Sequence, residues 1–420
     1  MTIAQDTLDN GMRVVTDRMD SVETVTLGVW VEAGARNETA EINGVSHLLE
    51  HMAFKGTGRR SALDIAVEIE NVGGLLNAYT SRETTVYYAT VMKENVDLAL
   101  DILSDILMNS AFAETELERE RAVILQEIGQ VNDVPDEIIF DRLQEIAFPD
   151  QALGRPILGT SEIVKNMPRT TLVDYMDAQY AGVRMILAAA GNVVHADLLE
   201  KAARCFSGLV PETDATVVPG TYAGGEFREQ RDLEQAHIIL GLEGLGFSDP
   251  DYYPLAVLST ALGGGMSSRL FQEVREKRGL VYSIYTFSSA YRDGGLFGIY
   301  AGTGEEQSAE LVTVLVDELC RVANDIMNED ELKRARTQIK AGVLMSLEST
   351  SSRAERLARH LQVYGRIIPI PEISERIDGV TAQDVQRAAQ RLLAMPPTLV
   401  GLGPVANMGN YESVATLLLA

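Results

Sequence analysis

Residues 211–226 read PETDATVVPGTYAGGE, a stretch with two prolines, three glycines and several small polar residues but no sustained helical period. This composition is typical of a linker. It lies near the middle of a 420-residue chain, a length that favours two or three domains. The sequence therefore predicts an N-terminal domain over 1–211, a linker over 212–226 and a C-terminal domain over 227–420.

Both sides of this linker show the same order of predicted elements: a strand, a turn with glycine, a helix, two paired strands, two long helices and a late strand. In the first half these are a strand at 23–32, helices from 44 to about 55 and over 61–72, strands at 75–81 and 84–91, helices over 93–109 and 114–131, and a buried strand at 185–193. In the second half they are a strand at 237–245, a helix at 249–264, strands at 280–290 and 294–303, helices over 305–325 and 328–349, and a strand at 397–404. The repeated order indicates an ancient duplication. Adjacent paired strands separated by long helices favour an α+β fold of two similar layered domains, with mainly antiparallel sheets, over a doubly wound parallel sheet.

Composition excludes several classes of protein. With 46% hydrophobic and 23% charged residues the chain is globular, and its net charge of −25 argues against binding to nucleic acid or to anionic lipid. No stretch approaches the roughly 18–20 apolar residues that span a bilayer, so no membrane insertion is expected. The N-terminal residues MTIAQDTLDNG show no secretory or transit signal. We therefore expect a cytoplasmic protein of a bacterium, or one of the mitochondrial matrix if a presequence has been removed.

Two of the five histidines lie in SHLLEHMAF, residues 46–54. His47 and His51 are four residues apart with Glu50 between them, so a helix places all three side chains on one face. Two imidazoles one turn apart can bind one small ion, and the carboxylate beside them can accept a proton from water. His-x-x-Glu-His is the inverted form of the zincin motif. The alternative is a helix without a metal, but the apolar flanks predict burial, which is costly for three such groups.

A catalytic zinc ion needs a third protein ligand. The predicted helix 114–131 offers Glu120 and Glu127, which are two turns apart and share a face. Glu127 lies in the apolar stretch AVILQEIGQ, where a solvated carboxylate is less expected. A solvated acidic face is the alternative for either residue.

Several motifs together resemble the M16 metallopeptidases, the family that includes pitrilysin, insulin-degrading enzyme and mitochondrial processing peptidase. The similarity covers nearly the whole chain. The motifs are most like those of the catalytic β-type subunit of processing peptidase, of which this chain would be a bacterial homologue. The motifs are HLLEHMAFKGT (47–57), NAYTSRETTVYYA (77–89), LQEIGQVNDVPDEIIFDRLQEIAF (125–148), LGRPILGT (153–160) and GGGMSSRLFQEVREKRGLVYSI (263–284).

The resemblance implies a metal site and its chemistry. In this family's pattern His47, His51 and Glu127 bind one Zn²⁺ per chain, and Glu50 is the general base. Glu120 matches a carboxylate that orients a ligand from outside the coordination shell. The implied activity is that of a zinc metalloendopeptidase of the EC 3.4.24 type.

The resemblance also implies residues that bind substrate. Asn77 and Ala78 match the edge strand on which a peptide is added as a further strand. Phe54 matches a residue of the pocket just past the scissile bond, although ordinary core packing is the alternative. Arg275 and Tyr282 match a pair by which the C-terminal half contacts substrate. The alternative for Arg275 is a solvated side chain in a charged helix. The alternative for Tyr282 is a structural residue of an apolar strand, where its hydroxyl needs a hydrogen-bond partner.

Glu137 and Asp141 match carboxylates that bind an arginine near the cleavage site. They are four residues apart and share a helix face, so they can flank one guanidinium; a solvated acidic face is the alternative. We therefore expect a preference for peptides with Arg shortly before the cut.

Family members form a clamshell whose chamber admits short or unfolded peptides, and this chain has the length of half of one. The resemblance thus implies two chains, either a homodimer or a heterodimer with an inactive homologue. The alternative function is a non-catalytic scaffold or core-type subunit of the same fold.

Overall fold

The computed structural model describes residues 2–419, which form two compact units. Unit 1 contains the chain up to Gly129 together with Arg155–Val218 and Met345–Ile367. Unit 2 contains Gln130–Gly154, Pro219–Leu344 and the chain from Ile368 on. Each unit therefore includes a segment that comes from the other half of the sequence.

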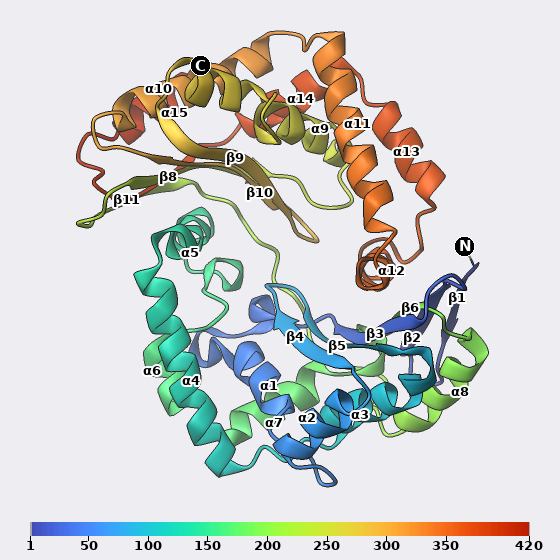
Figure 1. Ribbon diagram of the computed structural model, residues 1–420. Helices are drawn as coiled ribbons and strands as arrows, with labels where there is room; N and C mark the ends of the chain where they lie inside the picture. Colours follow the sequence, from blue (N-terminus) through green and yellow to red (C-terminus); the bar gives the residue numbers. More distant parts are fainter. Residues whose placement is uncertain (1, 420) are drawn as a thin grey trace. The chain divides into compact units, whose positions relative to one another are not determined.

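Unit 1 is built on a six-stranded sheet with the strand order β1-β2-β6-β3-β5-β4 (Figure 1). All neighbouring strands are antiparallel except the parallel pair β2 and β6. The strands are β1 (Thr2–Thr7), β2 (Arg13–Arg18), β3 (Thr24–Val31), β4 (Leu75–Thr80), β5 (Thr85–Met92) and β6 (Met185–Gly191).

Helices cover both faces of this sheet. They are α1 (Val45–Ala53), α2 (Ala62–Glu70), α3 (Val96–Met108), α4 (Glu114–Asp133), α6 (Ser161–Asn166), α7 (Arg169–Gln179), α8 (His195–Cys205) and α12 (Thr350–Tyr364). Short 3₁₀ helices are η1 (Ala35–Asn37), η2 (Ala40–Ile42), η3 (Lys93–Asn95) and η5 (Gly182–Arg184). One large core lies between the sheet and α1, α3, α7 and α8, and α12 packs on the opposite face (Figure 1).

The strand β3 shows the effect of this double cover. The alternation of Val25, Leu27, Val29 and Val31 predicts a strand with one buried face, but every residue from Val25 to Val31 is buried. The second face is buried because Trp30 packs against Leu357 and Ala358 of α12, while its Nε1 donates a hydrogen bond to Glu355 Oε2 at 2.9 Å.

Unit 2 repeats the topology of unit 1. Its five-stranded sheet has the order β7-β11-β8-β10-β9, which is the order β2-β6-β3-β5-β4 with five added to each number. The parallel pair falls at the corresponding place, between β7 and β11. The strands are β7 (Gly225–Gln230), β8 (Ala236–Gly244), β9 (Val281–Ala290), β10 (Gly295–Thr303) and β11 (Thr398–Gly403). The prediction of two similar α+β domains with mainly antiparallel sheets is confirmed.

The helices of unit 2 also lie on two faces. They are α5 (Pro135–Ala147), α9 (Tyr252–Gly263), α10 (Ser308–Asn324), α11 (Glu329–Ser346), α13 (Ile370–Asp378), α14 (Ala382–Leu392) and α15 (Tyr411–Leu419), with the 3₁₀ helix η4 (Ala152–Gly154) and the π-helix η6 (Phe271–Lys277). The core of α9, α10 and α14 lies against one face of the sheet, and α5 packs against the other.

The two repeats thus exchange equivalent helices. In the sequence, α5 follows the long helix α4 in the first repeat, and α12 follows the long helix α11 in the second. Each of them buries apolar side chains against the sheet of the other repeat. The domain boundaries at 211 and 227 stay predictions about the halves of the sequence, while the packed units combine segments from both. Among residues 2–419 no helix is long and apolar enough to cross a membrane.

This exchange predicts where core mutations act. Leu357 of α12 and Ile139 of α5 are both fully buried, so Leu357→Ala and Ile139→Ala should each cost about 2–5 kcal/mol of stability. Hydrogen exchange should rise in β3 and β6 for L357A, and in β8 and β11 for I139A. The chain's one tryptophan, Trp30, should report the unfolding of unit 1.

Leu344→Ala is the control, because this leucine of α11 is 53% exposed and its loss should cost less than about 0.5 kcal/mol. Increased exchange in β8 and β11 rather than in β3 and β6 for L357A would contradict the exchange of helices.

Candidate metal centre

The helix α1, which carries the His-x-x-Glu-His motif, begins directly after Gly44. Gly44 has a φ of +95°, and a Cβ built there would lie 2.7 Å from the carbonyl oxygen of Leu158. An L side chain is therefore disfavoured twice at this position, by the backbone conformation and by the lack of space.

A buried carboxylate caps the same helix. Glu38 accepts hydrogen bonds from the backbone N–H of Gly44 at 2.7 Å, the backbone N–H of Ser46 at 2.8 Å and the side-chain amide of Asn43 at 2.8 Å. It thus satisfies donors at the start of the helix that would otherwise lack a partner. Burial raises the pKa of Glu38 to about 7, even though these hydrogen bonds act to lower it.

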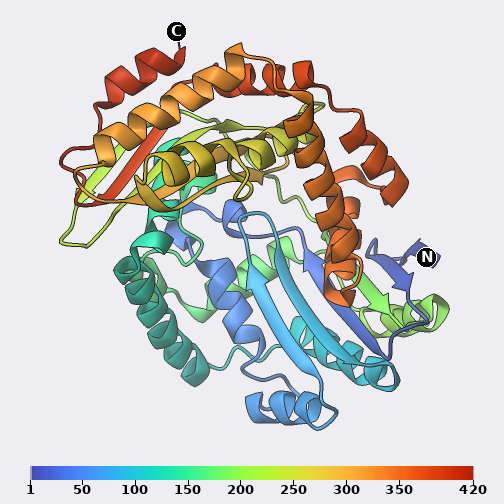
Figure 2. The same cartoon turned by 45° about the horizontal axis from the view of Figure 1, so that its top comes forward.

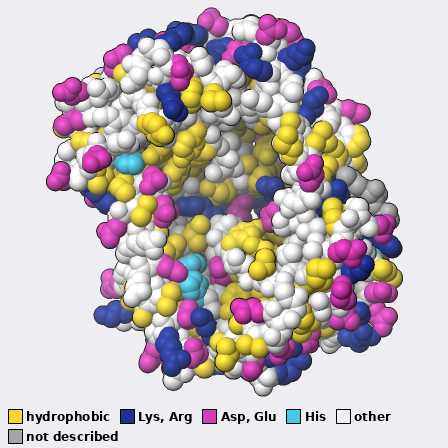
Figure 3. All heavy atoms as spheres, in the orientation of Figure 1, with side chains coloured by type: hydrophobic (Ala, Val, Ile, Leu, Met, Phe, Trp, Pro, Cys, Tyr) yellow, Lys and Arg dark blue, Asp and Glu magenta, His cyan; other side chains and the backbone are white. Residues whose placement is uncertain are grey.

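Three side chains from α1 and α4 converge at one point. The rings of His47 and His51 lie with their centroids 4.7 Å apart. Glu127 Oε2 is 3.8 Å from His47 Nε2 and 3.6 Å from His51 Nε2. One ligand atom from each of the three residues lies within 4.8 Å of the others, and no other group of three His, Cys, Asp or Glu residues among residues 2–419 converges in this way. Figure 3 shows a group of histidine side chains with acidic side chains beside it.

The donor set fits a zinc ion. Burial and the neighbouring His51 lower the pKa of His47 to about 4, so its ring is neutral near pH 7 and has a lone pair to offer a metal. Two imidazole nitrogens and one carboxylate oxygen are the three protein ligands of a catalytic zinc site, which leaves a position for water or substrate.

Glu50 lies beside this group without belonging to it. Burial raises the pKa of its carboxyl, and the charge of Glu127 adds to that rise, while the hydroxyl of Thr80 and the charge of His51 lower it. Thr80, the last residue of β4, donates a hydrogen bond from Oγ1 to Glu50 Oε2 at 2.6 Å. The motif gives no signal for Thr80, because the two residues come together only through the packing of β4 against α1.

Glu120 is buried and its Oε2 lies 3.0 Å from His51 Nδ1. It therefore contacts a histidine of the convergent group on the ring nitrogen that faces away from Glu127. This is the geometry of a carboxylate that orients a metal ligand.

The other residues of unit 1 that the sequence singles out lie near α1. Asn77 and Ala78 are on β4, which among residues 2–419 pairs with β5 alone and forms an edge of the sheet (Figure 2). Asn77 is exposed and Ala78 is half-buried. Phe54, directly after α1, is half-buried and packs against the core, with its ring 6.3 Å from that of Tyr87.

The other four residues that the sequence singles out, Arg275, Tyr282, Glu137 and Asp141, belong to unit 2. Arg275 lies in the π-helix η6, and its guanidinium is 5.0 Å from the ring centre of Tyr282. Tyr282 is 76% exposed on β9, so its hydroxyl faces solvent and needs no buried partner. Glu137 and Asp141 lie one turn apart on α5, where Glu137 is exposed and Asp141 half-exposed.

Comparisons with known proteins point to one family. Residues 13–161 match the family model for insulinase (peptidase family M16), and residues 166–339 match that for the peptidase M16 inactive domain. The chain is 39% identical over 398 residues to an uncharacterized zinc protease of Rickettsia felis, which covers 94% of this chain and 96% of that protein. It is 38% identical over 427 residues to the β subunit of mitochondrial-processing peptidase of Mus musculus, which covers 97% and 86%. The crystal structure of a protease from Helicobacter pylori superposes with a TM-score of 0.88 at 22% identity, over 96% of this chain and 99% of that one.

The fold, the donor set and these relatives define a zinc peptidase. The chain belongs to peptidase family M16, as its motifs indicate.

The buried Glu38 predicts a dependence of stability on pH. The folded protein keeps this proton up to about pH 7, whereas an unfolded chain releases it near 4.5. The folded state thus binds more protons between these values, so its stability falls as pH rises from about 4.5 to 7. Glu38→Gln should remove this contribution, and the difference in unfolding free energy between E38Q and wild type should change by up to about 1.4 kcal/mol per pH unit.

Urea unfolding of the metal-free proteins, followed by Trp30 fluorescence, measures this difference. Glu162→Gln, at an exposed position of α6, is the control. Parallel pH profiles for E38Q and wild type would contradict the assignment.

Proposed function

We propose that this chain is a zinc metalloendopeptidase in which His47, His51 and Glu127 hold the metal and Glu50 is the general base. The convergence of the three ligand atoms within 4.8 Å, with the Glu50 carboxylate beside them, is the observation that carries the proposal. Zinc, when bound, supplies a Lewis acid that lowers the pKa of water and polarises a peptide carbonyl.

The residues around Glu50 support its role. As general base, Glu50 takes the proton of the attacking water and passes it to the amine that leaves. Burial raises the pKa of its carboxyl, which helps it to hold that proton between the two steps. The hydrogen bond from Thr80 holds Oε2 in place and leaves the other oxygen for the water.

The edge strand β4 supports a substrate that is bound in part through its peptide backbone. A peptide that adds to this edge beside Asn77 and Ala78 is bound through backbone hydrogen bonds, which any extended segment can form. We assign short or unfolded peptides as substrates, because a folded protein offers few free extended segments. Phe54 is proposed to line a side-chain pocket next to the cleaved bond.

Two residue pairs of unit 2 are proposed to contact substrate as well. Arg275 and Tyr282 hold each other through a cation–π contact, and the exposed Tyr282 hydroxyl is a donor for a carbonyl or oxyanion. Glu137 and Asp141 share one face of α5 and are proposed to bind an arginine of the peptide.

Assembly with a second chain, identical or inactive, stays part of the proposal. A non-catalytic scaffold of the same fold is the alternative that the following experiment excludes or supports.

Glu50→Gln and Glu127→Gln form a matched pair, because both replace a carboxylate by an amide beside the same histidines. E50Q should keep one zinc ion per chain and lose peptide cleavage by about 10²-fold or more, since it removes proton transfer. E127Q should lose zinc, because it removes a ligand. Metal content by mass spectrometry and cleavage of a fluorogenic peptide, with and without a chelator, measure both effects.

Cleavage by E50Q at the wild-type rate would overturn the assignment of the base. A wild-type protein that binds zinc without cleaving any peptide of a library would favour the scaffold.

The arginine preference has its own test. In the double variant Glu137→Gln with Asp141→Asn, kcat/KM should fall about tenfold for peptides with Arg before the cut and stay unchanged for Arg-free peptides. Glu145 lies on the same helix and pairs with Arg142, so Glu145→Gln is the control. Equal losses on both kinds of peptide would contradict the preference.

A further inference from the structure

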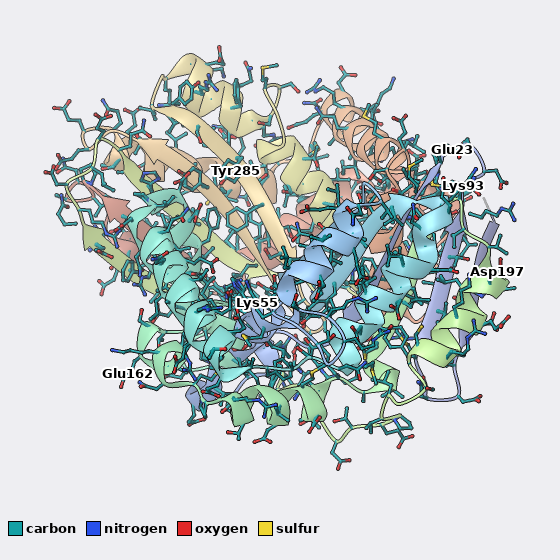
Figure 4. All side chains as sticks on the ribbon, turned by 60° about the horizontal axis from the view of Figure 1, so that its bottom comes forward. Glu23, Lys55, Lys93, Glu162, Asp197 and Tyr285 are labelled. Carbon is teal, nitrogen blue, oxygen red and sulfur yellow. The ribbon has the colours of Figure 1, made fainter. Side chains whose placement is uncertain are left out.

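Lys55 lies next to the metal centre, where its ammonium group pairs with Glu120. It is the second residue after the end of α1, and its Nζ lies 2.8 Å from Glu120 Oε1. Glu120 Oε2 in turn lies 3.0 Å from His51 Nδ1. One buried carboxylate of α4 is thus shared between a lysine and a histidine that both come from the α1 segment. Figure 4 labels Lys55, which lies beside the long helix α4.

The need for such a lysine follows from burial. The side chain of Glu120 is only 7% exposed, and a carboxylate in that position is costly unless both its oxygens have partners. Lys55 supplies the positive partner for Oε1. Its own side chain is 31% exposed, so the ammonium group remains partly hydrated while it holds the carboxylate.

The orientation of His51 depends on the same carboxylate. A carboxylate only accepts hydrogen bonds, so the partner nitrogen, Nδ1 of His51, carries the proton. The other nitrogen, Nε2, then keeps its lone pair, and this is the atom 3.6 Å from Glu127 Oε2. The contact therefore sets both the tautomer and the direction of the ring.

The backbone next to Lys55 is also constrained. Gly56 has a φ of +115°, a conformation that L side chains rarely adopt, and a Cβ there would be 3.2 Å from the carbonyl oxygen of Arg60. The Gly56 carbonyl accepts a hydrogen bond from the backbone N–H of Ala111 at 3.0 Å. The turn therefore directs the lysine toward α4 in one geometry.

We infer that Lys55 is a positioning residue of the zinc site, which acts through Glu120 to hold His51 Nε2 toward the metal and to fix α1 against α4. Lys55 contacts neither metal ligand nor substrate in this role. The inference rests on the proposed ligand set of His47, His51 and Glu127.

The test measures zinc affinity rather than cleavage. Metal-free protein is titrated with Zn²⁺ in competition with a chromogenic chelator. Lys55→Met should weaken zinc binding by about 10-fold or more, the usual effect of removing a partner outside the coordination shell. Lys55→Arg, which keeps the charge, should recover most of the affinity.

Lys93→Met is the matched control. Lys93 forms a salt bridge of 2.6 Å with Glu23, but both side chains are well exposed and distant from α1 (Figure 4). K93M should bind zinc as tightly as the wild type, within about twofold, because exposed pairs contribute little. Wild-type zinc affinity in K55M would overturn the inference.

A double-mutant cycle separates positioning from general loss of structure. If Lys55 acts through Glu120, then K55M should cause no further loss of zinc affinity in a Glu120→Gln background. If the losses of zinc affinity caused by K55M and by Glu120→Gln add up in the double variant, the inference is overturned. This holds also when K55M lowers the thermal midpoint of the metal-free protein. Failure of the ligand set is recognised separately, because E127Q would then keep wild-type zinc affinity.

Discussion

The burial of several ionisable side chains at one place is the constraint on which the centre of unit 1 depends. Two imidazoles and three carboxylates come together where α1, α4 and β4 meet. Polar groups in such a place are tolerated only when each has a partner, whether a metal ion, a hydrogen-bond donor or an opposite charge. Glu38 caps the start of α1, and glycines with positive φ lie near both of its ends. This local structure fixes the position of the helix and so of the side chains that must meet their partners.

The three carboxylates have the same chemistry, and their partners decide what each can do. Glu50 is held by the hydroxyl of Thr80, so it keeps an oxygen for proton transfer. Glu120 is held between His51 and Lys55, so both of its oxygens are engaged. Glu127 is more exposed than Glu120 and faces Nε2 of both histidines, which leaves it available to a metal.

The duplicated fold serves this centre although only one repeat carries the motif. The helix α9, which corresponds to α1, contains AVLSTAL instead, and its side chains join the apolar core of unit 2. The second repeat still contributes to unit 1 through α12. Its Glu355 accepts hydrogen bonds from Trp30 of β3 and from Tyr79 of β4 at 2.7 Å, and β4 is the strand that carries Thr80. A helix from the second half of the sequence thus supports the strand that holds the proposed base.

Much of this could be predicted from the sequence, because the signals are local. Apolar periodicity located β3, β4, β5 and the long helices, and the helix predicted over 61–72 is α2 (Ala62–Glu70), which Ser61 caps through its side chain. The spacing of His47, Glu50 and His51 within one helix turn is also local, and the resemblance to the family added Glu127 and Glu120. Apolar periodicity did not distinguish the π-helix at 271–277 from an α-helix, since a segment of seven residues is too short to define a period.

What depends on contacts between distant segments was decided only by the tertiary structure. The sequence determined two similar α+β repeats, a histidine pair on one helix and the type of metal those ligands prefer. It carried no sign that α5 and α12 exchange places, because an amphipathic helix shows which of its faces is apolar but not which sheet covers that face. The roles of Thr80 and Lys55 could not be predicted for the same reason. Their partners Glu50 and Glu120 lie 30 and 65 positions away along the chain, and only folding brings the hydroxyl and the ammonium group within hydrogen-bond distance of these carboxylates.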